Sequence, residues 1–209
     1  MHPNPVFRTE PDSRAIAFAR AQAFGTLALN ADPSPLLSHV PFVLSQDGTE
    51  LEAHLVRSNP IARALREPQA VVISVVGPHG YISPDWYGVE DQVPTWNYVA
   101  VHLRGTMSLM ADDALRGVLD RLSAELESRL LPKPPWTSSK MTPDVLKRMM
   151  RQIVPVFMQV DDIKSTFKLG QNKPEDVRLR AAEGVNVAEI GMETATLAVL
   201  MRQSASGEV

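Results

Sequence analysis

The chain has 209 residues, a formal net charge of −3 and 44% hydrophobic residues, which is ordinary for a globular protein. It contains no cysteine, so disulfides, thiolate metal sites and thiol nucleophiles are excluded. The slightly acidic balance argues against a broad nucleic-acid surface, which usually carries a basic excess. We see no signal peptide and no apolar segment long enough to span a bilayer. We therefore expect a single cytoplasmic domain over residues 1–209, with a helical extension at its C-terminal end.

The first part of the chain reads as one helix followed by three strands. Asp12 or Ser13 can cap a helix that continues to about Gln22. A turn at Asp47-Gly48 joins two of the strands into a hairpin. The predicted strands cover residues 24–30, 36–44 and 50–56. This pattern predicts an antiparallel meander.

Two further strands are expected in the middle of the chain. The apolar run Val71–Val76 is bounded by Gly77-Pro78, a pattern that is typical of a strand buried on both faces. A polar, aromatic loop follows, with Gly80 among its turn residues. We expect the next strand to begin near residue 93.

The segment Val93–Met110 alternates with a period of two. It places Trp96, Tyr98 and His102 on one face of the predicted strand and Asn97 on the other. Large aromatic side chains with a polar atom supply contact area for a flat ligand or for a subunit interface. Both uses stay open on this pattern alone.

The remainder of the chain alternates between helices and one strand. The predicted helices are 112–130, 142–150, one that begins at Pro174 and ends at Gly184, and 193–203; the predicted strand is 153–160. With the strands above, this makes about six strands with short turns and peripheral helices. The sequence therefore predicts an α+β architecture built on a six-stranded antiparallel β-barrel.

Common catalytic motifs are missing from the sequence. No HxxxH or HExxH spacing indicates a metal site, and no nucleophile elbow, phosphate loop or GxGxxG fingerprint is present. We therefore predict no metal ligands and no catalytic acid, base or nucleophile.

The segment HLVRSNP, residues 54–60, is a candidate phosphate site. His54 lies on the preceding strand, Arg57 supplies a planar cation, Ser58 a hydroxyl and Asn59 an amide, just before a predicted helix start. The alternative is an ordinary helix cap beside a surface arginine.

The segment FKLGQNK, residues 167–173, is a second polar cluster. Lys168, Gln171, Asn172 and Lys173 offer several hydrogen-bond donors within a short span. The alternative is a solvated turn before the helix that follows.

These segments resemble a known family. The motifs GPHGYISPDWY, VPTWNYVAVHLRG, HLVRSNP and FKLGQNK, together with a THLP-like strand at residues 38–41, are similar to those of the PaiB family of FMN-binding negative transcriptional regulators. The resemblance covers roughly residues 4–184. It departs at Gly170 and Lys173, where the family usually has serine and arginine, and nothing is carried over for residues 131–141.

The resemblance implies a split-barrel flavin-binding fold and a homodimer with FMN at the subunit interface. It gives Arg57 and Ser58 a role at the FMN phosphate. The residues it implies for cofactor binding are His54, Arg57, Ser58, Asn59, Trp96, Asn97, Tyr98, Lys168, Gln171 and Asn172.

Three functions compete on this basis. The first is an FMN-binding regulator, the second a flavin-dependent oxidoreductase of unknown substrate, and the third a dimer that has lost its flavin. No helix-turn-helix with a basic recognition helix is visible, so we expect direct sequence-specific DNA binding to be weak or absent.

Overall fold

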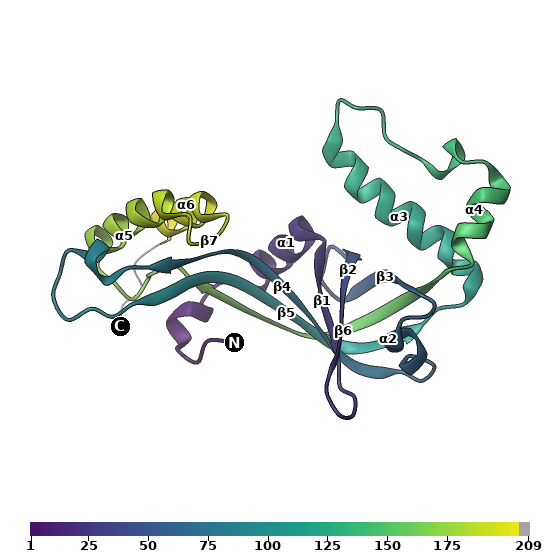
Figure 1. Cartoon of the computed structure of the whole chain (residues 1–209), viewed down its shortest axis with the longest axis horizontal. Coiled ribbons are helices and arrows are strands. Elements are labelled where there is room, and N and C mark those ends of the chain that lie inside the picture. The colour runs from purple at the N-terminus through teal and green to yellow at the C-terminus, as the bar shows by residue number, and fades with distance from the viewer. Residues whose placement is uncertain (205–209) are drawn as a thin grey trace. The chain divides into compact units, whose positions relative to one another are not determined.

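The computed structural model of the chain describes residues 1–204 (Figure 1). Residues 205–209, the last five of the predicted single domain, lie outside the described residues. The strands are β1 (Phe24–Leu29), β2 (Leu36–Leu44), β3 (Glu50–Val56), β4 (Gln69–Ile82), β5 (Thr95–Leu109), β6 (Ile153–Lys168) and β7 (Gly191–Met192). The α-helices are α1 (Asp12–Gln22), α2 (Pro60–Ala64), α3 (Leu115–Glu127), α4 (Pro143–Met150), α5 (Glu175–Ala188) and α6 (Thr194–Gln203).

Six of the strands close into a ring. Their order is β1-β2-β3-β6-β5-β4, and β1 also pairs with β4, which completes the circle. The pairing is antiparallel: Ala28 on β1 lies opposite Leu37 on β2 and Val72 on β4. Alternate side chains of these strands point inward and form the core; fully buried examples are Leu27, Phe42, Leu51, Ile73, Leu103, Met107 and Met158. The structure thus confirms the predicted six-stranded antiparallel barrel with peripheral helices.

β4 differs from its prediction in length and in burial. It continues through Gly77 and Pro78 to Ile82. Over Val71–Val76 its residues alternate between buried and more exposed, so that part of the strand has one core face. The apolar run is β-branched because such residues suit a pleated strand. The predicted turn at Gly80 is wrong: a Cβ there would lie 3.1–3.3 Å from Val185, Ile190 and Leu197, so a close contact requires glycine inside the strand.

Two later elements are longer than predicted. β6 does not stop at Val160 but continues to Lys168, and it lies between β3 and β5 in the sheet. α5 continues past Gly184, which was predicted to end it. A Cβ on Gly184 would lie 2.3 Å from the Trp86 ring, so this glycine allows the helix to approach an aromatic side chain closely.

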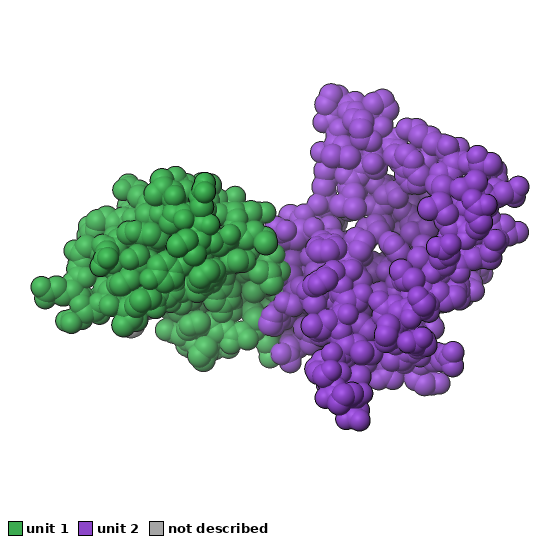
Figure 2. Space-filling model, viewed as in Figure 1, with its two compact units in different colours: residues 1–15, 76–101, 164–209 green, residues 16–75, 102–163 purple. Residues whose placement is uncertain are grey.

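The chain divides into two compact units (Figure 2). Unit 1 comprises residues 1–15, 76–101 and the chain from 164 onward, and unit 2 comprises residues 16–75 and 102–163. The long strands β4, β5 and β6 supply residues to both units. None of the described helices is both long and apolar enough to cross a membrane.

Candidate functional site

A cavity of about 300 Å³ in unit 1 brings two of the sequence motifs together. Thr95 and Asn97 reach it from β5, and Lys168, Asn172 and Lys173 from the end of β6 and the turn that follows. About seventy positions separate these motifs in the sequence. Their side chains meet because β5 and β6 are neighbours in the sheet.

Lys168 is a half-buried cation of this cavity. Its Nζ donates a hydrogen bond to Thr95 Oγ1 at 2.6 Å and lies 5.8 Å from the centroid of the Phe7 ring. Burial lowers the pKa of Lys168 below its ordinary value because a desolvated ammonium loses hydration. An anionic or carbonyl-bearing ligand would supply the missing acceptors.

A second cation stands beside an aromatic ring. Lys173 Nζ donates to Gln92 Oε1 and lies 5.2 Å from the centroid of the Tyr87 ring. Tyr87 is buried, and burial raises the pKa of its hydroxyl, which keeps the phenol neutral. Two lysines and two aromatic rings therefore line the same cavity.

Asn97 and Gln171 are buried, and each has polar partners in unit 1. Asn97 Nδ2 donates to Met201 Sδ at 3.5 Å, which is a weak bond. Gln171 donates to the Phe167 carbonyl and accepts from the Leu169 N–H at 2.8 Å. Gln171 thus fixes the turn that presents its neighbours, whereas Asn172 is exposed at the cavity.

The predicted aromatic face of β5 is present. Trp96 is 40% exposed, Tyr98 is half-buried, and Asn97 on the opposite face is buried, as the alternation predicts. Trp96 Nε1 donates to His79 Nδ1 at 3.3 Å, and the Trp96 ring centroid lies 6.4 Å from that of Tyr81. This is a row of aromatic rings with one exposed member.

Arg57 of the HLVRSNP segment lies in unit 2 and has several acceptors. Its Nε donates to the Arg151 carbonyl at 3.1 Å, and its Nη2 donates to the Ile153 carbonyl at 3.2 Å and to Asp112 at 3.3 Å. The guanidinium therefore connects the end of β3 to the start of β6. Its side chain is still 48% exposed, so it remains accessible to a ligand.

The neighbours of Arg57 have different environments. Asn59 caps α2, because its Oδ1 accepts the Ile61 N–H at 2.9 Å; this is the cap that was the alternative reading of the segment. Ser58 is exposed, and its hydroxyl has no partner among residues 1–204. His54 carries a buried Nδ1 that lacks a partner within the described residues, and burial lowers its pKa.

The ten predicted residues thus fall into two groups. His54, Arg57, Ser58 and Asn59 belong to unit 2, and the other six belong to unit 1. Within residues 1–204 no group of three or more His, Asp or Glu side chains is placed to hold a metal ion.

Several lining residues of the unit 1 cavity were not among the predicted site residues. Thr95 lies two positions before Asn97 on the same strand face, so strand periodicity could have identified it. Tyr87 lies within the GPHGYISPDWY motif. Phe7 and His2 come from the N-terminal segment, which carries no recognisable signal.

Comparison with known proteins identifies the family. Residues 1–162 match the family described as "Putative FMN-binding domain". The chain belongs to this family. It is also 32% identical over 160 residues, covering 76% of each chain, to the protease synthase and sporulation protein PAI 2 of Bacillus subtilis. The resemblance to the PaiB family is confirmed.

Solved structures support the fold. The FAD and heme binding protein of Mycobacterium smegmatis has a TM-score of 0.53 at 22% identity, covering 78% of this chain and 73% of that one. The flavocytochrome Anf3 of Azotobacter vinelandii has a TM-score of 0.52 at 13% identity, covering 80% and 72%. At these identities the likeness shows the fold, which is the split barrel that the motifs implied.

Proposed function

We propose that the protein binds FMN and acts as a flavoprotein of the PaiB type in the cytoplasm. The observation that carries this proposal is the unit 1 cavity, in which Asn97 of one family motif and Lys168 of another line the same space. Family membership and the folds of the flavin-binding neighbours support it. FMN supplies the redox chemistry when it is bound.

The donor set suits the chemistry of a flavin. A flavin ring needs an apolar or aromatic wall and donors for its carbonyl edge. The unit 1 cavity offers Phe7 and Tyr87 as aromatic surface, and Lys168 and Asn172 as donors. Trp96 and Tyr98 lie on the opposite face of β5, so in this proposal they contact the flavin only from the other side of the strand, at the subunit interface. Gln171 holds the turn that presents Asn172 and the cavity lysines. A cavity of about 300 Å³ lies at the lower end of the range for ligand sites.

The phosphate is assigned to the HLVRSNP segment of one subunit, and the flavin ring to the unit 1 cavity of its partner. Arg57 supplies a partly exposed guanidinium and Ser58 an exposed hydroxyl, and both are suited to phosphate oxygens. We assign Asn59 to the shape of this segment, since its amide caps α2. His54 carries a buried Nδ1 that lacks a partner within the described residues, so a ligand atom would have to displace the atoms that cover it before it could bond there.

A homodimer with FMN at the subunit interface is part of the proposal. The outer face of β1, β2 and β4 in unit 2 carries no Asp, Glu, Lys or Arg at its paired positions, which are Phe24, Thr26, Ala28, Leu37, His39, Pro41, Val72 and Ser74. Phe24 is 55% exposed and Leu37 is 65% exposed. An uncharged face with exposed large apolar side chains is typical of a surface that a partner covers.

FMN titration tests the function. The full chain is titrated with FMN while quenching of flavin fluorescence is followed. We expect saturable binding that Lys168→Met weakens by about tenfold or more, because a charged hydrogen-bond donor is lost. Lys140→Met, at an exposed lysine of unit 2 that lines neither cavity, is the matched control and should bind like wild type. Absence of saturable binding by folded wild-type protein would reject the proposal.

Two measurements distinguish a regulatory role from an oxidoreductase role. The motif resemblance supports regulation, and the expected cofactor supports oxidoreductase activity. Oxidation of NADH or NADPH by the FMN-loaded protein, with turnover beyond one equivalent, favours an enzyme. FMN binding without turnover, together with a transcriptional effect of deleting the gene, favours the regulator.

A further inference from the structure

The helix α4 borders a second cavity, of about 290 Å³, in unit 2. Pro143, Leu146, Lys147 and Met150 line it at the i, i+3, i+4, i+7 spacing of one helix face. None of the eight residues of α4, all of which the structure describes, is buried. The apolar face of α4 therefore borders a space large enough for a ligand.

The opposite wall comes from the start of α3 and the segment before it. Leu115 is buried there and adds apolar surface to that of Leu146 and Met150. The charged lining residues are Arg57, Asp112, Arg116, Lys147 and Arg151. The lining therefore contains four cationic side chains and one carboxylate around an apolar surface. This composition favours a ligand with an anionic end and an apolar body.

Two of the four cations are already engaged. Arg57 donates to Asp112 and to two backbone carbonyls. Arg116 pairs with Asp120 at 2.8 Å. The side chains of Lys147 and Arg151 have no hydrogen bond or ion pair within the described part of the chain. These two cations are available to an anion.

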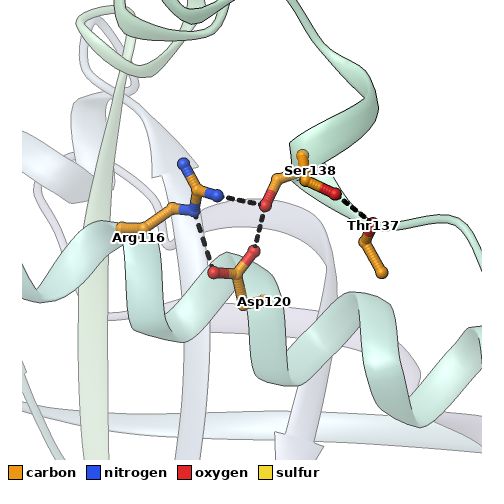
Figure 3. Close-up of polar contacts among 5 residues, drawn as sticks. Arg116, Asp120, Thr137 and Ser138 are labelled. Atoms are coloured by element: carbon orange, nitrogen blue, oxygen red, sulfur yellow. Dashed lines mark hydrogen bonds and ion pairs between the residues drawn. The ribbon is translucent and has the colours of Figure 1, made fainter.

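A polar network holds the cavity wall in place (Figure 3). Ser138 is buried; its hydroxyl donates to Asp120 at 2.6 Å and accepts from Arg116. These bonds lower the pKa of Asp120, with the Ser138 bond as the largest cause, so the carboxylate stays ionised. The network ties the segment that leads into α4 to α3, so the position of α4 does not depend on filling the cavity.

The local charge adds to the selectivity for anions. Residues 128–151 contain six Lys or Arg residues and one acidic residue, in a chain whose net charge is −3. A concentrated field of one sign attracts ligands of the other sign.

We propose that this cavity binds a small amphipathic carboxylate. The carboxylate lies between Lys147 and Arg151, and the apolar body contacts Leu115, Leu146 and Met150. At about 30 Å³ for each water-sized group, the cavity has room for about ten non-hydrogen atoms, which corresponds to a carboxylate with an apolar body of about seven or eight carbons. This site is additional to the proposed FMN function.

Octanoate is the probe, and isothermal titration of the full chain is the measurement. We expect octanoate to bind with a Kd below about 1 mM. Acetate lacks the apolar body and octan-1-ol lacks the charge, so each should bind at least about tenfold more weakly. Equal affinity for octanoate and octan-1-ol would overturn the assignment of the cations.

Variants locate the binding. The double variant Lys147→Gln/Arg151→Gln should weaken octanoate binding by about tenfold or more. Arg148→Gln removes a charge from the same helix without touching the lining and should bind like wild type. Leu146→Trp should block the cavity while far-UV circular dichroism stays unchanged. No octanoate binding by folded wild-type protein, or an equal loss in Arg148→Gln, would overturn the proposal.

FMN separates this inference from the proposed function. Arg57 lines this cavity and is also the proposed phosphate ligand, whereas the octanoate carboxylate is assigned to Lys147 and Arg151. Saturating FMN should therefore weaken octanoate binding by less than the Lys147→Gln/Arg151→Gln variant does. Displacement by FMN would assign the cavity to the flavin and overturn this inference while leaving the proposed function intact. Octanoate binding by a chain that does not bind FMN would reject the proposed function alone.

Discussion

Replacing Arg57 by alanine separates a phosphate contact from a structural contact. The ion pair with Asp112 is exposed, at 48% and 74% for the two side chains, so its loss should cost at most about 1 kcal/mol. The two bonds to carbonyls, at 3.1 and 3.2 Å, should add about 1 kcal/mol together, because water can replace the donor at this exposed position. We therefore expect the free energy of unfolding to fall by about 1–2 kcal/mol.

The effect on FMN should be separable from that loss. If Arg57 contacts the phosphate, its removal should weaken FMN binding by about 1.5–3 kcal/mol, or roughly 10- to 150-fold. Riboflavin lacks the phosphate, so its affinity should be lower for wild type and nearly unchanged by the substitution.

The assay combines two measurements on three proteins. FMN and riboflavin are titrated against wild type, Arg57→Ala and Arg63→Ala, and urea unfolding gives the stability of each. Arg63 is an exposed arginine of α2 and serves as the matched control. Equal losses of FMN and riboflavin affinity would show that Arg57 supports the fold only, and unchanged FMN affinity would refute its assignment to the phosphate.

Four further outcomes can be measured. Gly184→Ala places a methyl group 2.3 Å from Trp86, so it should destabilise the protein by about 1–3 kcal/mol in urea unfolding, whereas relief of glycine entropy alone would stabilise it. Burial lowers the pKa of His54 below its ordinary value of 6.5, so near and below that pH the unfolded chain binds more protons than the native chain. The free energy of unfolding should therefore fall on acidification. His54→Gln should flatten this pH dependence in unfolding curves recorded between about pH 7.5 and 5. Phe24→Asp should convert the proposed dimer into a 23 kDa monomer by light scattering, and a wild-type monomer at micromolar concentration would reject the dimer. The isolated protein should give no strong operator-specific gel shift, and a salt-dependent shift with one preferred sequence would contradict this.

The barrel could be predicted because its strands alternate in polarity and are separated by turn residues. β2 and β3 have the bounds that the sequence predicts, and α1 begins and ends as predicted. The errors in β4 and α5 occur where glycine or proline was taken as the end or interruption of an element, and a further error is the end of β6, predicted at Val160. Gly80 and Gly184 lie inside β4 and α5 because other segments of unit 1 approach them closely, and such long-range contacts leave no local signal.

The site could be predicted only in part. The polar character of FKLGQNK was evident, but a sequence cannot show which of its amides face a cavity and which bond to the backbone. Gln171 bonds to the backbone, whereas Asn172 lines the cavity. Phe7 was missed because nothing in the N-terminal sequence indicates that it returns to contact Lys168.

The length of β6 explains why distant motifs meet. Had β6 ended at Val160, residues 161–166 would have separated it from the polar segment 167–173 without an assigned path. Because the strand continues to Lys168 beside β5, its last residue comes within 2.6 Å of Thr95, the first residue of β5. The sheet places Lys168 at the cavity, and the Gln171 amide fixes the turn that follows. A ligand would therefore meet side chains whose backbone is already ordered, which lowers the entropic cost of binding.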